Sequence, residues 1–228
     1  MTKRYLEVIR LGRLSYTAAL KIQDKYARQI LDGLSDCKQD QLAIAHLQKL
    51  LLVEHDPVYT IGIRRKGYSE SDIKKLQLLG ADFHYTNRGG LITFHGPGQL
   101  VVYPILYLKN FSMGMKTYIC HLEKTVIDTC SHFGIQSHTT PDTGVWVGNN
   151  KIAAIGVHGS RYVTTHGLAL NCDIDLGWFE HIVPCGLEGK GVTSLTKESC
   201  HRVTATEATR PLLKSFGTTF DCTLVDPK

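Results

Sequence analysis

Residues 88–99 read RGGLITFHGPGQ, and this stretch sets the expectation for the fold around it. Four glycines and one proline bracket the apolar run Leu91–Phe94, which predicts a short strand with a tight loop at each end. Glycine lets the main chain approach a ligand closely or adopt positive φ, and strand-held loops commonly carry binding residues. A hairpin turn is sufficient to explain Gly89-Gly90 alone. The whole run favours a loop that lines a substrate site, because polar side chains are interleaved in it: Arg88, Thr93, His95 and Gln99.

The composition is that of a globular protein with one buried core. The chain has 228 residues, of which 43% are hydrophobic and 21% are charged. Its longest apolar run, Leu100–Leu108, is interrupted by Pro104 and is far shorter than the ~20 residues that cross a bilayer. We therefore expect no membrane span.

The charge pattern gives little support to nucleic-acid binding. The formal net charge is +5, and the clusters Arg64–Lys66 and Lys74-Lys75 are short and scattered. No basic stripe is interleaved with aromatic residues, so nucleic acid is not an expected partner.

The seven cysteines indicate a reducing compartment, either cytosol or mitochondrial matrix. None forms a Cys-x-x-Cys pair, which argues against both a zinc site and a disulfide framework. The basic N-terminus resembles a mitochondrial targeting segment, but Leu6–Leu11 predicts a strand that ends at Gly12. A segment that the fold uses cannot be a removable presequence.

The apolar spacing predicts one α/β domain with a mixed β-sheet flanked by helices. A capping box, Thr204-x-x-Glu207, marks the last helix, and Pro211 predicts that this helix begins later or kinks. Residues 171–193 are expected to be rich in loops. Helices are predicted over 15–33, 71–79, 119–133 and after 204, and strands over 6–11, 50–53, 58–62, 91–94, 100–106, 145–147, 151–157 and 162–170.

Cys185 is the first candidate for a nucleophile. It lies between Pro184 and Gly186 on a constrained turn, whereas Cys120 and Cys130 fall on a predicted helix. A nucleophilic thiolate needs a nearby cation or base. Local context alone supports a nucleophile and a buried filler about equally.

Lys151 is the first candidate for a base, because it opens a strand directly after the tight turn 148–150. A desolvated lysine can accept a proton. Without further information, an exposed charge at the end of a strand is the simpler interpretation. No phosphate-binding loop, His-Glu-x-x-His motif or Gly-x-Ser-x-Gly motif is present.

Four motifs, taken together and in order, resemble the lipoyl(octanoyl) transferase family, octanoyl-acyl carrier protein:protein N-octanoyltransferases, in their mitochondrial form. They are RGGLITFHGPGQL at 88–100, KIAAIGVH at 151–158, THGLALN at 165–171 and IVPCGLEGKGVTSL at 182–195. The resemblance extends from about Val8 to Phe220. It implies a fold like the catalytic domain of lipoate and biotin protein ligases, one catalytic domain over 1–228, and no metal or cofactor.

The resemblance also implies roles for residues. Cys185 corresponds to the nucleophile that carries the acyl group as a thioester, and Lys151 to the lysine paired with it. His95 is expected to position the substrate. The residues implied to line the acyl site are Arg88, Gly89, Gly90, Leu91, Ile92, Thr93, Phe94, His95, Ala154, Ile155, Gly156, Gly167, Leu168 and Ala169.

The implied reaction moves an octanoyl group from octanoyl-acyl carrier protein to a lysine of a lipoyl-domain protein such as the glycine cleavage H protein. The alternatives are an ATP-dependent lipoate-protein ligase, a non-catalytic protein that binds acyl carrier protein or lipoyl domains, and a cysteine hydrolase. The N-terminus and the cysteine count favour the mitochondrial matrix, whereas a bacterial source would place the chain in the cytoplasm.

Overall fold

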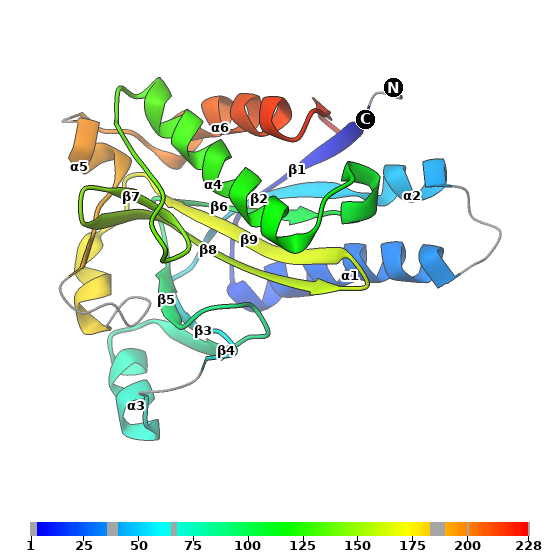
Figure 1. Ribbon diagram of the computed structural model, residues 1–228. Helices are drawn as coiled ribbons and strands as arrows, with labels where there is room; N and C mark the ends of the chain where they lie inside the picture. The colour runs from blue at the N-terminus through cyan, green and yellow to red at the C-terminus, as the bar shows by residue number, and fades with distance from the viewer. Residues whose placement is uncertain (1–3, 36–40, 65–67, 183–189, 200, 228) are drawn as a thin grey trace.

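The computed structural model describes residues 4–35, 41–64, 68–182, 190–199 and 201–227, which form both helices and strands (Figure 1). The helices are α1 (Tyr16–Ser35), α2 (Gln41–Leu47), α3 (Glu70–Leu78), α4 (Met115–His132), α5 (Leu195–Ser199) and α6 (Ala205–Thr219), with 3-10 turns η1 (Leu108–Phe111) and η2 (Leu176–His181). The strands are β1 (Tyr5–Leu14), β2 (Lys49–His55), β3 (Val58–Ile61), β4 (Asp82–Tyr85), β5 (Ile92–His95), β6 (Gln99–Ile105), β7 (Val145–Val147), β8 (Asn150–Ser160), β9 (Val163–Asn171), β10 (Gly191–Val192) and β11 (Thr223–Val225).

A mixed sheet forms the centre of the molecule, in the order β10-β8-β9-β6-β2-β1-β11, with β7 paired to β8. β1 pairs in parallel with both β2 and β11, and β10 pairs in parallel with β8. The pairs β2–β6, β6–β9 and β8–β9 are antiparallel. The predicted α/β class with a mixed sheet is confirmed.

Helices cover both faces of this main sheet (Figure 1). On β2, Leu50 and Leu52 face the core beneath α4 and α6, whereas Leu51 and Val53 face the core beneath α1. Successive side chains of a strand point to opposite faces, so a strand covered on both sides reads as a continuous apolar run. This is why the run Leu50–Val53 could be recognised as a buried strand from the sequence.

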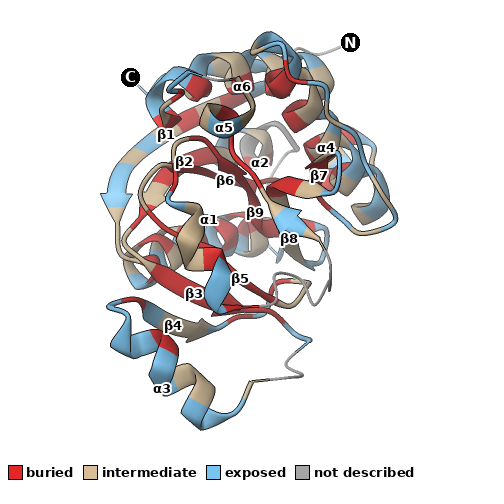
Figure 2. Ribbon diagram, turned by 90° about the vertical axis from the view of Figure 1, so that its left-hand side faces the viewer, coloured by how far each residue is buried: buried red, intermediate tan, exposed pale blue. Residues whose placement is uncertain are grey.

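A second, smaller sheet of order β4-β3-β5 lies on the α1 side of the main sheet and carries α3 (Figure 2). Its own core is aromatic: Phe94 of β5 stacks on Trp178 of η2 with ring centroids 4.8 Å apart, and Tyr59 of β3 packs against both. The Gly89 N–H donates to the Val157 carbonyl at 2.9 Å, which ties the loop before β5 to β8 of the main sheet. The small sheet is thereby held close to the main sheet.

The last helix differs from its prediction. The capping box is confirmed, since Thr204 Oγ1 accepts from the Glu207 N–H and the Glu207 carboxylate accepts from the Thr204 N–H. The expectation that Pro211 delays the helix is wrong, because α6 begins at Ala205 and contains Pro211. A proline inside a helix costs ~3 kcal/mol. The N-terminal cap stabilises the helix itself, and Leu212 and Phe216 pack into the core. These two contributions offset the cost of the proline.

The stretch 171–193 contains η2 and β10 as well as loops, and residues 183–189 lie outside the described part of the chain. Among the helices that the structure describes, none has the length and apolar character that crossing a bilayer requires.

Candidate active site

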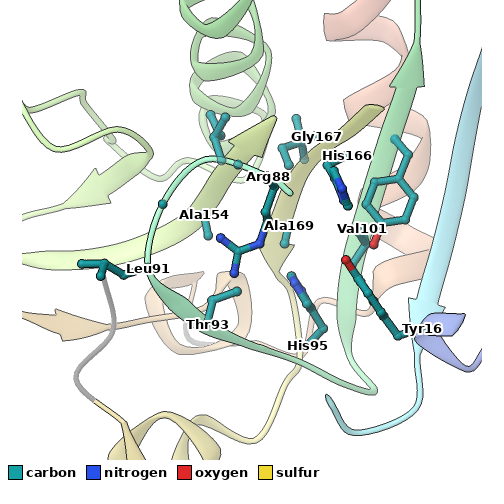
Figure 3. A pocket seen from close by; sticks show the side chains of 15 residues that line it. Tyr16, Arg88, Leu91, Thr93, His95, Val101, Ala154, His166, Gly167 and Ala169 are labelled. Atoms are coloured by element: carbon teal, nitrogen blue, oxygen red, sulfur yellow. The ribbon is translucent and has the colours of Figure 1, made fainter. Parts of the chain in front are cut away.

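A cavity lies between the main sheet and β5, and most of the site residues expected from the sequence line it (Figure 3). Two segments of the main sheet form one wall, and the segment around β5 forms the other. The lining residues that the sequence predicted are Arg88, Gly90, Leu91, Thr93, His95, Ala154, Ile155, Gly156, Gly167, Leu168 and Ala169.

Three of the predicted residues do not line this cavity. The side chains of Ile92 and Phe94 point to the opposite face of β5, into the aromatic core of the small sheet. This follows from the two-residue period of a strand, which sends Leu91, Thr93 and His95 to the cavity side. Gly89 instead donates a hydrogen bond from its backbone N–H to the Val157 carbonyl of β8.

Two glycines allow the two walls to approach each other and the neighbouring strand. A Cβ on Gly167 would lie 2.2 Å from the Val102 carbonyl oxygen of β6. A Cβ on Gly156 would lie 3.0 Å from both Arg88 Cδ and the Gly89 carbonyl oxygen. Larger residues at these positions would push the strands or the loop away from the cavity.

Arg88 lies at the centre of the cavity wall and is only 7% exposed. Its Nη2 donates to the Thr60 carbonyl at 2.7 Å and to the Thr60 hydroxyl at 2.9 Å, and Nη1 donates to the Gly89 carbonyl at 2.9 Å. A guanidinium stays charged at ordinary pH. Arg88 therefore fixes the loop before β5 to β3 and brings a permanent positive charge to the cavity.

Lys151 lines a second, adjoining cavity, which shares Thr93 and Ala154 with the first. Lys151 is 6% exposed, so the alternative of an exposed strand-end charge is wrong. Its Nζ donates to the Thr143 carbonyl at 3.0 Å and lies 4.7 Å from the centre of the Trp146 ring. Lys190 Nζ also lies 4.7 Å from that ring and pairs with Asp142 at 2.7 Å.

Cys185 lies outside the described residues, as do Cys37 and Cys200. Phe179 and Val192, which flank Cys185 in the sequence, both line the Lys151 cavity. Burial raises the pKa of the Cys130 thiol to about 11 and that of Cys172 still further, so neither is an activated thiol. Both belong to the core beneath α4, as expected for Cys130.

Sequence reasoning missed four residues of the cavity: Tyr16, Val101, Tyr103 and His166. Tyr16 comes from α1, far from any of the motifs, and Tyr103 comes from β6, three residues after the motif at 88–100. His166 directly precedes Gly167 and has a φ of +58°, a conformation rare for residues other than glycine. Gln23 Oε1 of α1 accepts from its backbone N–H at 2.7 Å. For His166, the sequence offered one signal, which is the order Thr-His-Gly within a predicted strand.

The histidines of this region are neutral. Burial lowers the pKa of His95 to about 3 and that of His166 to about 3. Burial also lowers the pKa of His55, which lies beside them, to about 4. Within the described ranges, no group of three or more histidine, cysteine, aspartate or glutamate side chains could hold a metal ion.

Comparisons with known proteins agree with this architecture. A family model described as the lipoyl protein ligase A/B catalytic domain matches residues 15–217. The mitochondrial octanoyl-[acyl-carrier-protein]:protein N-octanoyltransferase of Danio rerio is 54% identical, over 98% of this chain and 96% of that protein. The putative lipoyltransferase 2, mitochondrial, of Drosophila melanogaster is 54% identical, over 95% of this chain and 90% of that protein.

Solved structures share the fold at low sequence identity. A lipoate-protein ligase A bound with ATP superposes with a TM-score of 0.74 at 14% identity, covering 98% of this chain and 88% of that one. The biotin protein ligase of Aquifex aeolicus gives a TM-score of 0.53 at 11% identity, covering 95% of this chain and 69% of that one. The expected similarity to the lipoate and biotin ligase catalytic fold is confirmed.

Proposed function

This chain belongs to the lipoyl protein ligase A/B catalytic-domain family, and from that premise we propose that it is an octanoyltransferase of lipoate biosynthesis that works through a thioester on Cys185. The donor is octanoyl-acyl carrier protein, and the acceptor is a lysine of a lipoyl-domain protein such as the glycine cleavage H protein. The whole of 1–228 acts as one catalytic domain. The mitochondrial names of its animal relatives favour the mitochondrial matrix as its location.

The observation that carries this proposal is the burial of Lys151 beside a cavity with an apolar wall. A lysine that is only 6% exposed on the wall of a cavity contributes little to solubility, so its position there favours a functional role. The cavity next to it is lined by apolar side chains from both of its walls, among them Leu91, Val101 and Ala169. The flanking positions Phe179 and Val192 support a reactive Cys185 near the same lysine.

The first half of the reaction moves the acyl group onto the enzyme. The Cys185 thiolate attacks the thioester carbonyl carbon, the bond to the carrier sulfur breaks, and the carrier leaves as a thiolate, which takes up a proton from water. The tetrahedral intermediate carries a negative oxygen that fixed hydrogen-bond donors stabilise. Backbone N–H groups of the glycine-bearing loops are suited to this role, because they need no reorganisation.

The second half moves the acyl group to the acceptor. The acceptor lysine is protonated at neutral pH and must lose a proton before it can attack. Lys151, in its uncharged form, takes that proton. The amine then attacks the enzyme thioester, its nitrogen loses a second proton as the amide forms, and the leaving sulfur takes up that proton, so that Cys185 is released as a thiol. No step needs ATP or a metal ion.

The cavity wall explains a preference for a medium-length acyl chain. Each methylene that leaves water contributes ~0.8 kcal/mol, so a chain that fills the apolar part of the cavity binds more tightly than a shorter one. His95, Arg88 and Thr93 place polar groups along one side of that chain and position it against the main sheet.

A direct experiment tests the nucleophile. Incubation with octanoyl-acyl carrier protein should add one octanoyl group to the intact protein, as seen by mass spectrometry, and hydroxylamine should remove it. Cys185→Ala should not acquire that adduct. An identical hydroxylamine-labile adduct on Cys185→Ala would exclude Cys185 as the nucleophile, and ATP-dependent attachment of free lipoate would favour a ligase instead.

A further inference from the structure

One end of the cavity is polar, although an octanoyl tail is apolar. We use the name polar end for the part of the cavity lined by Tyr16, His95 and Tyr103. None of these three residues lines the adjoining Lys151 cavity, although Gln99, whose Oε1 lies 2.7 Å from His95 Nδ1, does line it. The rings of Tyr16 and His95 are stacked with centroids 6.4 Å apart, and both side chains point into the cavity (Figure 3).

Tyr16 brings a hydrogen-bond donor that lacks an acceptor. The residue is 2% exposed, and its hydroxyl has no hydrogen-bond partner in the described part of the chain. Burial raises the pKa of Tyr16 to about 12, so the hydroxyl keeps its proton at neutral pH. A buried polar group without a partner costs ~1–3 kcal/mol. A bound group that accepts a hydrogen bond would remove this cost.

His95 brings an acceptor, because a chain of amides determines which of its nitrogens carries the proton. Asn171 Nδ2 donates to the Thr193 carbonyl at 2.9 Å, so Asn171 Oδ1 is the atom that accepts from Gln99 Nε2 at 2.9 Å. Gln99 Nε2 also donates to the Phe94 carbonyl. Gln99 Oε1 is thus an acceptor 2.7 Å from His95 Nδ1, which must carry the hydrogen. His95 Nε2 is left with a lone pair.

Tyr103 brings a second acceptor by similar logic. The Leu14 carbonyl, 3.1 Å from His55 Nδ1, can only accept, so that nitrogen carries the hydrogen of His55. His55 Nε2 then accepts from the Tyr103 hydroxyl at 2.7 Å. The Tyr103 oxygen keeps its lone pairs. The polar end therefore offers one donor and two acceptors, and a hydroxyl group can accept from that donor and donate to one of the two acceptors.

We propose that the polar end is a binding site for one hydroxyl group, with the Tyr16 hydroxyl as donor to it and His95 Nε2 as acceptor from it. This inference rests on the proposed acyl-binding role of the cavity. With a plain octanoyl chain the hydroxyl is that of a water molecule; with a hydroxylated chain it belongs to the substrate. The enzyme therefore accepts octanoyl chains that carry a hydroxyl at the carbon that reaches Tyr16. Gln99 and Asn171 are positioning residues that hold His95 in the required tautomer.

The test compares octanoyl-acyl carrier protein with a series of monohydroxylated octanoyl donors, in which the hydroxyl moves one carbon at a time along the distal half of the chain. Transfer to a lipoyl domain is measured as kcat/KM. At least one isomer should be used within about tenfold of octanoyl. Tyr16→Phe should lower kcat/KM for that isomer, relative to octanoyl, by about tenfold, the loss expected for one buried hydrogen bond.

Tyr118→Phe is the matched control, because Tyr118 is equally buried but belongs to the core beneath α4. It should leave the ratio of the two donors unchanged. If every isomer falls more than about tenfold below octanoyl, or if Tyr16→Phe does not change the ratio, the hydroxyl site is excluded. Absence of octanoyl transfer by the unaltered enzyme would instead exclude the proposed function.

A spectroscopic measurement tests the acceptor separately from activity. Long-range ¹H–¹⁵N NMR spectra distinguish the two neutral tautomers of histidine. His95 should carry its proton on Nδ1, as should His55, which serves as an internal reference. Gln99→Leu should convert His95 to a mixture of tautomers, whereas Gln48→Leu, a loss of another buried glutamine, should not. A proton on His95 Nε2 in the unaltered protein would overturn the proposal.

Discussion

Two contacts restrain the amine of Lys151, and Lys190 contacts the same ring. The Thr143 carbonyl accepts a hydrogen bond from Nζ, the Trp146 ring lies beneath it, and a second amine, Lys190 Nζ, contacts the same ring. Cation–π contacts of buried groups are worth up to ~2 kcal/mol. The amine is therefore held in one place, as a group that moves a proton must be.

Lys151→Arg tests whether that amine transfers a proton. Arginine retains the positive charge and the length needed to contact Trp146, but it does not lose its proton. We expect kcat for transfer to the acceptor to fall ~100-fold or more. The measurement is octanoylation of a purified lipoyl domain under saturating donor.

The matched control for this change is Lys49→Arg. Lys49 is another largely buried lysine at the beginning of a strand, where it pairs with Glu7 at 2.7 Å. The Lys49→Arg variant should keep the kcat of the unaltered enzyme for octanoyl transfer. Full turnover by Lys151→Arg would show that Lys151 is not the proton acceptor.

Strand β9 contributes four of the residues that line the cavity: His166, Gly167, Leu168 and Ala169. All of its residues are buried, and it pairs with both β6 and β8. Gly167 lies at its centre and against the Val102 carbonyl. The absence of a side chain there lets β9 lie close to the Val102 carbonyl of β6, while His166 and Ala169 of β9 line the cavity (Figure 3).

Gly167→Ala should destabilise the protein because its Cβ would lie 2.2 Å from a backbone oxygen that cannot move alone. We expect the free energy of unfolding to fall by ~2–4 kcal/mol, measured by urea denaturation. Gly114→Ala is the control, since no atom lies within 4 Å of the added methyl group. An equal loss in both variants would contradict the steric explanation.

Helix α6 contains Pro211, which is not among the buried residues of the helix. Pro211 removes one backbone N–H within the helix, while Leu212 and Phe216 form the contact with the core. Pro211→Ala should raise the free energy of unfolding by ~1–3 kcal/mol, because alanine restores the hydrogen bond and the helical propensity. Thermal unfolding followed by circular dichroism would detect this, and a lower midpoint would contradict it.

The packing of the two sheets against each other buries three neutral histidines in one region. His55, His95 and His166 come from β2, β5 and β9, and they share the surroundings of Tyr16 and Tyr103. Burial lowers the pKa of each histidine, since the charged form loses its hydration. The fold therefore depends on these rings remaining uncharged.

Stability should fall in acid because of these histidines. Their pKa values are about 4 for His55 and about 3 for His95 and His166, against 6.5 in the unfolded chain. Below pH 6.5 the unfolded chain binds more protons than the folded protein, so the contribution is complete above that pH and is lost as the pH falls toward 4 and 3. We expect a loss of about 1–2 kcal/mol per histidine at about pH 5.

Urea denaturation at a series of pH values measures this dependence. In the His55→Asn variant, the free energy of unfolding should fall less in acid, and the difference should equal the contribution of one histidine. His201→Asn, which changes an exposed histidine, should leave the decline unaltered. A pH profile that is the same for the His55 variant and the unaltered protein would contradict the assignment.

Local sequence determined the elements and half of the site. Periodicity identified the buried strand β2 and the helix α4, and the capping box located the start of α6, because these signals arise from neighbours along the chain. The motif at 88–99 indicated the β5 wall of the cavity, since glycines and polar residues around one strand have few structural explanations.

Only the tertiary structure decided which side chains face the cavity and what surrounds them. A strand's period separates Thr93 and His95 from Phe94, but the sequence does not say which face is covered by which sheet. Tyr16 and Tyr103 reach the cavity because α1 and β6 pack beside β5, a contact between segments far apart in the chain. The burial of Lys151 likewise depends on Trp146 and on the strands that close over it, which no local pattern encodes.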